Sequence, residues 1–316
     1  MEKRKLVVLT GPTAVGKTKL SIELARRIGG EIISADSCQV YKHMDIGSAK
    51  IRLEEMEDIP HFLVDELEPS EEFNVVVFQQ KTKQYMEEIY KRGHIPILVG
   101  GTGFYIQAVL YDIHFSKDDD NHKIREELET LAKEKGAGYL HEELRKFDPA
   151  SAEAIHANNV KRVIRALEYY KLTGQKISEH NEEQRKNESP YDFSYFVLND
   201  HRELLYKRID KRVDEMIAEG LVEEVQKLKA MGYDRSFVSM QGLGYKEIFS
   251  FLDGEISLED AIYILKRDTR HFAKRQITWF KREKEVIWVN KPEFDYNNEK
   301  ILDFMQKHIN SVKYSL

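Results

Sequence analysis

The sequence has 316 residues, a net charge of −6 and 41% hydrophobic residues, so its apolar side chains can fill the core of one large domain or two ordinary ones. No apolar run approaches the roughly 18 to 20 residues of a membrane-spanning helix, and a single cysteine, Cys38, excludes an internal disulfide framework or a thiolate metal cluster. We therefore expect a soluble, cytoplasmic protein.

Short apolar runs alternate with helical segments through the first third of the sequence. We expect helices over 16–29 and 73–93, and strands over 5–10, 30–36 and 94–103, of which the third runs into a glycine turn. The N-terminal apolar run superficially resembles a signal peptide, but it lasts about five residues before a glycine turn, as a first strand would. This alternation is typical of a parallel sheet covered on both faces.

The character of the sequence changes near residue 115. Residues 117–174 are polar and helix-rich, 181–190 form a polar connector, 191–200 return to strand character, and 202–232 are long and helical. We predict an α/β fold in which a P-loop NTPase-like parallel sheet core, formed by 1–115 and 191–316, is interrupted by a helical insertion domain over 116–190.

The stretch "GPTAVGKT" fits the pattern of a phosphate-binding loop between a strand and a helix. Glycines let the backbone wrap so that successive N–H groups point at an anion, and the following helix adds its positive dipole end. A lysine supplies a mobile charge, and the Thr18 hydroxyl commonly ligates Mg²⁺. The pattern predicts a diphosphate-binding site made by Gly11, Thr13, Ala14, Val15, Gly16, Lys17 and Thr18.

A P-loop enzyme that acts on a triphosphate normally carries an Asp after a later apolar strand, where it helps to hold the metal. Here "IPILV" is followed by Gly100, Gly101 and Thr102, and the carboxylate stands instead at the end of the second strand, as Asp36. Because the carboxyl ends of parallel strands face the ligand crevice, we expect Asp36 and Thr102 to face Lys17. This arrangement favours a base beside a diphosphate over a standard triphosphate hydrolase.

Several motifs occur together in a fixed order. They are "GPTAVGKT" (11–18), "SADSCQVYKHMDIGSAK" (34–50), "ILVGGTGFYIQAVL" (97–110), "VKRVIRALEYY" (160–170) and "TRHFAKRQITWF" (269–280). With these motifs the chain closely resembles, essentially end to end, the bacterial tRNA dimethylallyltransferases, also called tRNA isopentenyltransferases. The second, third and fifth motifs are far more specific than the first.

The resemblance implies transfer of a prenyl group from dimethylallyl diphosphate to the exocyclic N6 amine of adenosine 37 in tRNAs that read codons beginning with U. It also implies Mg²⁺ as cofactor and a target base extruded from the anticodon loop. Adenine N6 is a poor nucleophile, so stabilisation of the departing diphosphate is expected to provide most of the acceleration.

The resemblance also implies roles for individual residues. Asp36 becomes the candidate general base for the N6 proton, Thr102 a second hydrogen-bonding group at the same amine, and Lys17 and Arg212 partners of the leaving group. Ser37, Cys38 and Gln39 are expected to contact the target base and its neighbours. Arg208 and Arg212, at i and i+4, project from one helical face and are predicted diphosphate ligands. From the residues alone, Asp36 could equally be a helix cap or metal ligand, and Thr102 a cap.

Basic segments supply candidate contacts to the RNA backbone. Segment 266–284 holds eight Lys or Arg against two acids, and Arg267, Arg270, Lys274 and Lys281 are expected to share one helical face opposite Leu265, Phe272 and Trp279. Val163, Leu167 and Tyr170 are expected to form a buried stripe with a basic edge beside it. A solvated charged face is the alternative for that basic edge and for the pair Arg208 and Arg212. The predicted tRNA-binding set is Asp36, Ser37, Cys38, Gln39, Thr102, Arg125, Lys161, Arg162, Arg165, Gln241, Gly242, Gly244, Arg270 and Lys274.

We expect the helical insertion to grip the anticodon stem-loop, because proteins read RNA mainly in loops and must extrude a stacked base to modify it. Two other readings stay open at this point. One is a small-molecule kinase of the adenylate or shikimate kinase type, and the other a non-catalytic RNA-binding NTPase. No feature predicts an obligate protein partner, and a monomer is the default.

Overall fold

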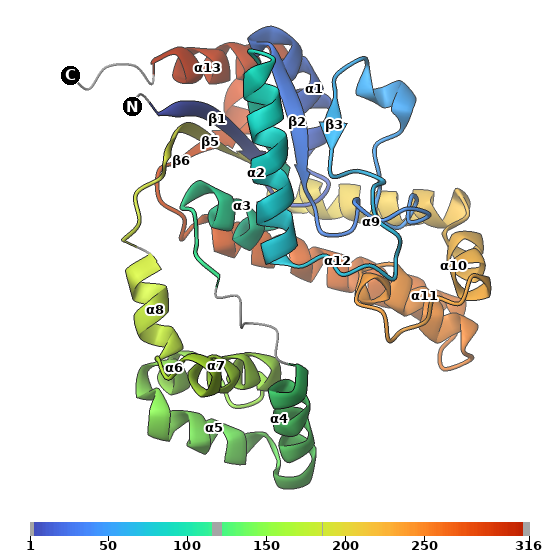
Figure 1. The fold of residues 1–316 in the computed structure, drawn as a ribbon. Coiled ribbons are helices and arrows are strands. Elements are labelled where there is room, and N and C mark those ends of the chain that lie inside the picture. The colour runs from blue at the N-terminus through green and yellow to red at the C-terminus, as the bar shows by residue number, and fades with distance from the viewer. Residues whose placement is uncertain (1–2, 116–121, 185, 312–316) are drawn as a thin grey trace. The chain divides into compact units, whose positions relative to one another are not determined.

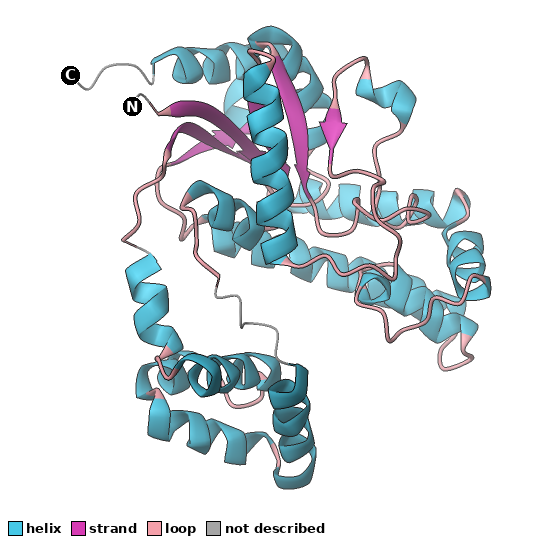
Figure 2. Cartoon of the chain, viewed as in Figure 1, coloured by secondary structure: helices cyan, strands magenta, loops and turns pink. Residues whose placement is uncertain are grey.

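The computed structural model describes residues 3–115, 122–184 and 186–311, which divide into two compact units (Figure 1). One unit takes in Met1–Val109 and Pro190–Leu316, and the other takes in Leu110–Ser189, whereas the sequence predicts an insertion over 116–190. Figure 2 shows that the strands all belong to the first unit, while the described residues of the second are helices and connecting loops. None of the described helices is long and apolar enough to cross a membrane.

The first unit is built on a six-stranded sheet in the order β3-β2-β4-β1-β5-β6, and every strand pair is parallel. The predicted α/β fold with a P-loop-like parallel sheet is therefore confirmed. The strands are β1 (Arg4–Thr10), β2 (Gly30–Ala35), β3 (His61–Phe62), β4 (Ile95–Gly100), β5 (Tyr191–Asn199) and β6 (Val286–Asn290).

Both faces of the sheet are covered, which explains why its strands read as continuous apolar runs. Val7 and Leu9 of β1 join the core beneath α1 (Lys17–Ile28) and α13 (Asn298–Ser311), whereas the buried Val8 between them points to the opposite face. In Figure 1, α2 (Val75–Lys91) crosses that opposite face. Asn74 caps α2 by accepting hydrogen bonds from the amides of Val76 and Val77 at 2.9 and 3.0 Å.

After β5 the chain forms a helical group before it returns to the sheet. The elements are α9 (Arg202–Ala218), α10 (Leu221–Ala230), η2 (Ser239–Gln241), α11 (Tyr245–Leu252) and α12 (Leu258–Phe280). The predicted single helix over 202–232 is wrong, because Gly220 adopts a left-handed φ of 102° and separates α9 from α10. The remaining elements of the first unit are η1 (Leu53–Met56), α3 (Gly103–Leu110) and η3 (Lys291–Phe294).

The second unit has its own apolar core, made by helices alone. Its helices are α4 (His122–Lys135), α5 (Ala137–Phe147), α6 (Pro149–Ala154), α7 (Val160–Thr173) and α8 (Ile177–Gln184). Val163 and Leu167 of α7 pack in this core as predicted, but the next buried aromatic residue is Tyr169, and Tyr170 is only half-buried. The buried face of α7 is therefore wider than predicted and includes Ile164, Ala166 and Tyr169.

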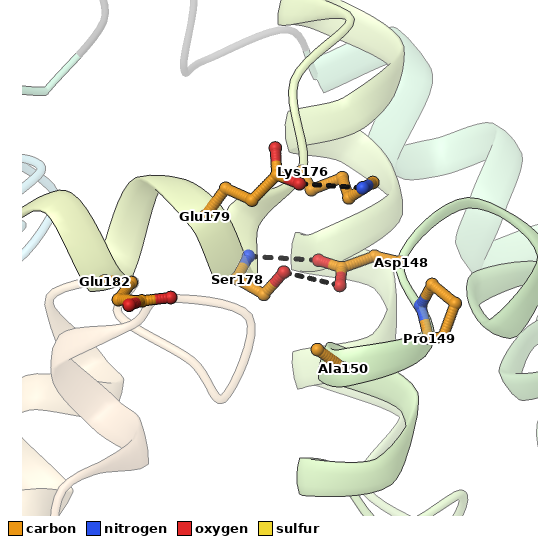
Figure 3. A pocket seen from close by; sticks show the side chains of 7 residues that line it. All are labelled: Asp148, Pro149, Ala150, Lys176, Ser178, Glu179 and Glu182. Atoms are coloured by element: carbon orange, nitrogen blue, oxygen red, sulfur yellow. Dashed lines mark hydrogen bonds and ion pairs between the residues drawn. The ribbon is translucent and has the colours of Figure 1, made fainter.

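A hollow of about 330 Å³ in the second unit is lined by side chains that are already paired (Figure 3). The buried Asp148 caps α6 by accepting from Ser151, and it also accepts from the amide and hydroxyl of Ser178 at 3.0 and 2.6 Å. Lys176 pairs with Glu179 at 2.7 Å. The bonds of Asp148 to Ser178 hold the start of α8 against α6. The polar side chains around the hollow thus serve to join these two helices.

Candidate active site at the carboxyl ends of the strands

The phosphate loop between β1 and α1 has the backbone that the sequence predicts. Gly11 has a φ of 145°, and a Cβ there would lie 2.5 Å from the carbonyl oxygen of Leu198, so no other residue fits. Ala14 and Gly16 both adopt left-handed φ values, 61° and 95°. Gly16 also caps the N-terminus of α1, where unpaired amides and the helix dipole favour an anion.

Lys17 lies inside this loop, where its ammonium group donates to the carbonyl oxygens of Gly11 and Pro12, both at 3.0 Å. Burial lowers the pKa of Lys17 to about 8; the negative charge of Asp36 opposes this shift and the positive charge of Arg212 adds to it. Lys17, Asp36 and Arg212 therefore influence one another electrostatically, although they come from three different parts of the chain.

Asp36 and Thr102 follow the ends of two neighbouring strands, β2 and β4, whose terminal residues Ala35 and Gly100 are paired in register. The amide of Thr102 donates to the carbonyl oxygen of Ala35 at 3.2 Å, which ties the two strand ends together. One oxygen of Asp36 accepts from the amide of Cys38 at 2.8 Å, and this bond orients the carboxylate. Thr102 also stands directly before α3, where its carbonyl oxygen accepts the first helical hydrogen bonds from the amides of Tyr105 and Ile106.

The two predicted diphosphate arginines of α9 have different surroundings. Arg212 is partly buried, and burial lowers its pKa, while Asp36 is the largest of the opposing charges. Arg208 forms an ion pair with the buried Asp200 and donates to the carbonyl oxygen of Ala14 at 3.4 Å. Arg208 therefore touches the phosphate loop on its carbonyl side.

The segment that follows Asp36 lies against the loop over 240–244, although the two are far apart in the chain. A Cβ on Gly242 would lie 3.2 Å from the Sγ of Cys38, so the backbone there approaches the cysteine closely. Gly244 has a φ of 94° and is buried, and Gln241 is exposed. The structure thus brings together the segment predicted to contact the target base and a second segment predicted separately to contact the tRNA.

The side chains of the Asp36 segment are not equally available. Burial, followed by the charge of Asp36, raises the pKa of Cys38 to about 12, so its thiol stays protonated. Gln39 donates to the carbonyl oxygens of Ser48 and Ala49 at 3.4 and 3.2 Å, which fixes the loop behind it. Ser37 is half-buried beside them.

Gln276 of α12 is a site residue that the sequence analysis missed. Its Oε1 accepts from the amide of Thr13 at 2.9 Å, and its Nε2 donates to the carbonyl oxygen of Gly101 at 3.0 Å. The side chain therefore links the phosphate loop to the glycine turn after β4. The two glycines of this turn leave room for side chains of α12. A Cβ on Gly101 would lie 2.1 Å from the side chain of Gln276, and a Cβ on Gly103 would lie 2.2 Å from that of Trp279.

Glu224 of α10 is a second residue that the sequence did not reveal. Its buried carboxylate accepts from the amides of Asp45, Ile46 and Gly47 at 2.9, 2.7 and 3.1 Å, and from the hydroxyl of Tyr245 at 2.8 Å. Four donors on one carboxylate fix the loop that follows the Asp36 segment. A lone Glu in an amphipathic helix gave no signal of this contact.

The basic residues predicted on one face of α12 have different surroundings. Arg270 is partly buried and pairs with Asp210 of α9, and Lys274 is exposed. The buried side of the helix carries Leu265 as predicted, but its other buried members are Ala261, Ala273, Gln276 and Phe280. Phe272 and Trp279, which we expected on that face, are only half-buried.

The basic residues of the second unit divide into paired and exposed groups. Arg125 of α4 and Arg165 of α7 both bind the buried carboxylate of Glu168, at 2.9 and 3.3 Å. Both arginine side chains stay about 40% exposed. Lys161 and Arg162, at the start of α7, are exposed.

The donor groups available for Mg²⁺ are few. Among residues 3–115, 122–184 and 186–311, no three His, Cys, Asp or Glu side chains gather in a metal-binding group. Mg²⁺ usually keeps several waters and is held by one or two protein groups together with substrate phosphates. Thr18, exposed in the first turn of α1, therefore fits a magnesium ion that is bound mainly through the diphosphate.

Comparison with known proteins agrees with this geometry. The family model described as "IPP transferase" matches residues 39–283. The chain belongs to the IPP transferase family. Two similar relatives in this family are the tRNA dimethylallyltransferases of Lachnoclostridium phytofermentans, 66% identical over 93% of each chain, and of Acetivibrio thermocellus, 53% identical over 96% of this chain and 97% of that one.

Solved structures of IPP transferases also resemble this chain. The full-length tRNA isopentenylpyrophosphate transferase from Bacillus halodurans is 45% identical, with a TM-score of 0.74 over 98% of each chain. A eukaryotic dimethylallyltransferase acting on tRNA is 32% identical, with a TM-score of 0.83 over 99% of this chain and 81% of that one. The family membership and the fold thus agree with the resemblance seen in the sequence.

Proposed function

We propose that this chain is a tRNA dimethylallyltransferase, which transfers the prenyl group of dimethylallyl diphosphate to N6 of adenosine 37. The observation that carries the proposal is the mutual electrostatic influence of Lys17, Asp36 and Arg212 at the carboxyl ends of the strands, in a member of the IPP transferase family. Two cations and one carboxylate suit a reaction that releases diphosphate and removes one proton.

The phosphate loop holds the donor by its diphosphate. The amides of the loop and the first turn of α1 point at the phosphate oxygens, and Lys17 and Arg212 balance their charge. Charge grows on the diphosphate as the C–O bond breaks, so preorganised donors stabilise the transition state more than the ground state. Thr18 and the diphosphate oxygens would hold Mg²⁺, which supplies further charge stabilisation when bound.

Asp36 removes the proton from the adenine amine. Its carboxylate is oriented by the amide of Cys38 and lies near Lys17, where the diphosphate is bound. The N6 proton becomes acidic as the new C–N bond forms, and Asp36 accepts it; such assistance is typically worth about 10²- to 10⁴-fold in rate. Thr102, on the neighbouring strand end, hydrogen-bonds the same amine and helps to orient it.

The target base enters beside the Asp36 segment. Ser37, Cys38 and Gln39, together with the loop that contains Gln241, Gly242 and Gly244, form the wall that meets the base and its neighbours. The close approach of Gly242 to Cys38 supports this assignment, because it puts both segments in one place. The neutral thiol of Cys38 serves as a packing surface for the base.

Basic residues of both units contact the RNA backbone. Arg270 and Lys274 of α12 lie on the first unit, and Lys161 and Arg162 of α7 are exposed on the second. Arg125 and Arg165 keep part of their guanidinium groups exposed while Glu168 holds them in position. These contacts give salt-sensitive affinity for the anticodon stem-loop. The second unit grips that stem-loop, and tRNAs that read codons beginning with U are the substrates, in the cytoplasm.

The decisive experiment incubates the protein with radiolabelled dimethylallyl diphosphate, Mg²⁺ and an unmodified tRNA that has adenosine next to the anticodon. We expect label in the tRNA, no label when guanosine replaces that adenosine, and at least a hundredfold slower transfer for Asp36→Asn. Asp58→Asn, at an exposed position, is the matched control and should transfer at the normal rate.

The alternatives give different results in the same assay. A small-molecule kinase would consume ATP with a small acceptor and leave the tRNA unlabelled. A non-catalytic RNA-binding NTPase would hydrolyse a nucleotide and change its RNA affinity without any labelled product. Either result, with a correctly folded protein, would refute the transferase assignment.

A further inference from the structure

Two cations lie on the carbonyl side of the phosphate loop, apart from the amides that meet an anion. Lys291, the first residue of η3, donates its ammonium group to the carbonyl oxygen of Val15 at 3.3 Å. Arg208 of α9 donates to the carbonyl oxygen of Ala14 at 3.4 Å. A Cβ on Gly16 would lie 3.4 Å from the Lys291 nitrogen, so the ammonium group is directly against the last turn of the loop.

The planar peptide group connects these contacts to the anion-binding side. In a trans peptide the C=O of one residue and the N–H of the next point in opposite directions. The carbonyl of Ala14 shares its plane with the amide of Val15, and the carbonyl of Val15 shares its plane with the amide of Gly16. A cation that holds the Val15 oxygen on one side therefore holds the Gly16 N–H on the other, where the diphosphate binds. The amide of Val15 itself donates to the carbonyl oxygen of Pro12 at 3.4 Å, so Arg208 supports the turn that this bond closes.

The loop needs such support because its backbone is strained. Ala14 has a φ of 61°, a left-handed conformation that disfavours any residue with a Cβ, by roughly 1–2 kcal/mol. Gly16 has a φ of 95°. Without contacts on its carbonyl side, the peptide between these residues could turn toward a relaxed conformation and aim its amide away from the anion.

The cations are themselves held in place. Asp200, whose side chain is fully buried, binds Arg208 and accepts from the amide of His201 at 2.7 Å and from the hydroxyl of Tyr296 at 3.0 Å. These bonds outweigh the effect of burial and keep the pKa of Asp200 below its usual value, so the carboxylate stays charged. One carboxylate beside two cations leaves a net positive charge behind the loop, which also favours a bound diphosphate.

We propose that Lys291, together with Arg208, is a positioning residue that clamps the carbonyl side of the phosphate loop and aims its amides at the diphosphate of the prenyl donor. Lys291 comes from the segment after the last strand, far from the loop in sequence. This inference deepens the proposed function by assigning the donor site a residue that does not touch the donor itself. It assigns Arg208 the same indirect role in place of the direct contact predicted from sequence.

The test compares Lys291→Met, Lys291→Arg and the control Lys300→Met. Lys300 also follows β6, but it pairs with the exposed Asp295 at the surface. Isothermal titration with inorganic diphosphate and Mg²⁺ gives the dissociation constant without tRNA or turnover. Steady-state transfer then gives the Michaelis constants for dimethylallyl diphosphate and tRNA separately, and the thermal midpoint checks folding.

We expect Lys291→Met to weaken diphosphate binding and raise the donor KM by about tenfold, because the variant loses a hydrogen bond from a charged donor at a half-buried position. The tRNA KM should be unchanged, Lys291→Arg should come within about threefold of the original protein, and Lys300→Met should have no effect.

Two results would overturn the inference. One is unchanged diphosphate affinity in a folded Lys291→Met protein. The other is a folded Lys291→Arg protein that binds diphosphate no better than Lys291→Met, because an arginine can reach the same oxygen and keeps the charge. Because diphosphate binding needs no RNA, failure of the transferase assignment would appear separately, as normal diphosphate binding without labelled tRNA.

Discussion

Replacement of Gly101 by alanine tests whether Gln276 links the glycine turn to the phosphate loop. The new Cβ would lie 2.1 Å from the Nε2 of Gln276, well inside van der Waals contact, whereas its nearest contact outside Gln276 would be an ordinary 3.7 Å to the carbonyl oxygen of Gly11. Gly101 does not have a left-handed φ, so the alanine itself is not strained. The clash is therefore with one flexible side chain, which must leave its place.

The magnitude follows from the two hydrogen bonds that Gln276 makes, to the amide of Thr13 and to the carbonyl oxygen of Gly101. Each such bond contributes about 1 kcal/mol, and a buried partner left unpaired costs about 1–3 kcal/mol. Gly101→Ala and Gln276→Ala should each lower the free energy of unfolding by about 2–4 kcal/mol. Both changes break the same two bonds, so the double variant should lose little more than either single one.

Tryptophan fluorescence during thermal unfolding is the suitable assay. Both tryptophans of the chain, Trp279 and Trp288, lie in the first unit, so the signal reports that unit separately from the helical one. Each single variant should lower the midpoint by about 5–15 °C, at about 2–4 °C for each kcal/mol. Thr278→Ala, at an exposed position of the same helix, is the control and should change it little.

The double-mutant cycle decides the question. The coupling free energy between positions 101 and 276 should be about as large as the loss in either single variant, about 2–4 kcal/mol. If the losses of the two single variants simply added, Gln276 would not be the group that the new methyl displaces, and the proposed link between turn and loop would be wrong.

Three further predictions concern chemistry and local structure. Lys17 has a pKa of about 8 and binds an anion only when protonated, so kcat/KM for the donor should fall as the pH rises above about 8. The kcat value should hold to higher pH, because bound diphosphate raises the pKa of Lys17. A kcat/KM profile that stays flat to pH 10 would contradict this. Glu224→Gln, by removing the charge that four donors share, should destabilise the first unit by about 1–3 kcal/mol in the same fluorescence assay, whereas the exposed Glu223→Gln should not. Removal of Mg²⁺ with EDTA should abolish transfer but leave the thermal midpoint within about 1 °C. The described residues contain no cluster of acids that could hold the ion, so Thr18 and the donor would hold it. A large drop in the midpoint would argue for a structural metal.

The parts of this molecule that follow local rules could be predicted from the sequence. The phosphate loop, the parallel sheet and the approach of Asp36 to Thr102 depend on short patterns and on the rule that parallel strands end at one edge of the sheet. The break at Gly220 was missed because an isolated glycine inside a helical pattern is often tolerated, and only the left-handed φ reveals the end of the helix.

Contacts between distant segments explain the residues that were missed. The sequence analysis assigned no role to Gln276, which stands inside a basic motif. Nothing in its local pattern indicates that its side chain contacts the glycine turn after β4. Its position on the same face as Ala273 and Phe280, both buried, was the available signal: a polar side chain on a buried helical face needs partners. Lys291 and Glu224 carried no such signal, because surface lysines and glutamates are common and their partners lie far away in the chain.

Helix α12 links the phosphate loop to the basic surface that we propose contacts the RNA. Its buried face presents Gln276 to Thr13 and Gly101, and its opposite side carries Arg270, which pairs with Asp210 of α9. Helix α9 in turn carries Arg208 and Arg212, which reach the phosphate loop and the Asp36 charge. Under the tRNA contact that we propose, an RNA phosphate that competes with Asp210 for Arg270 would act on the same two helices that carry Gln276, Arg208 and Arg212. Because close-packed interiors transmit strain, we expect the proposed tRNA contact at Arg270 and the geometry of the donor site to be coupled.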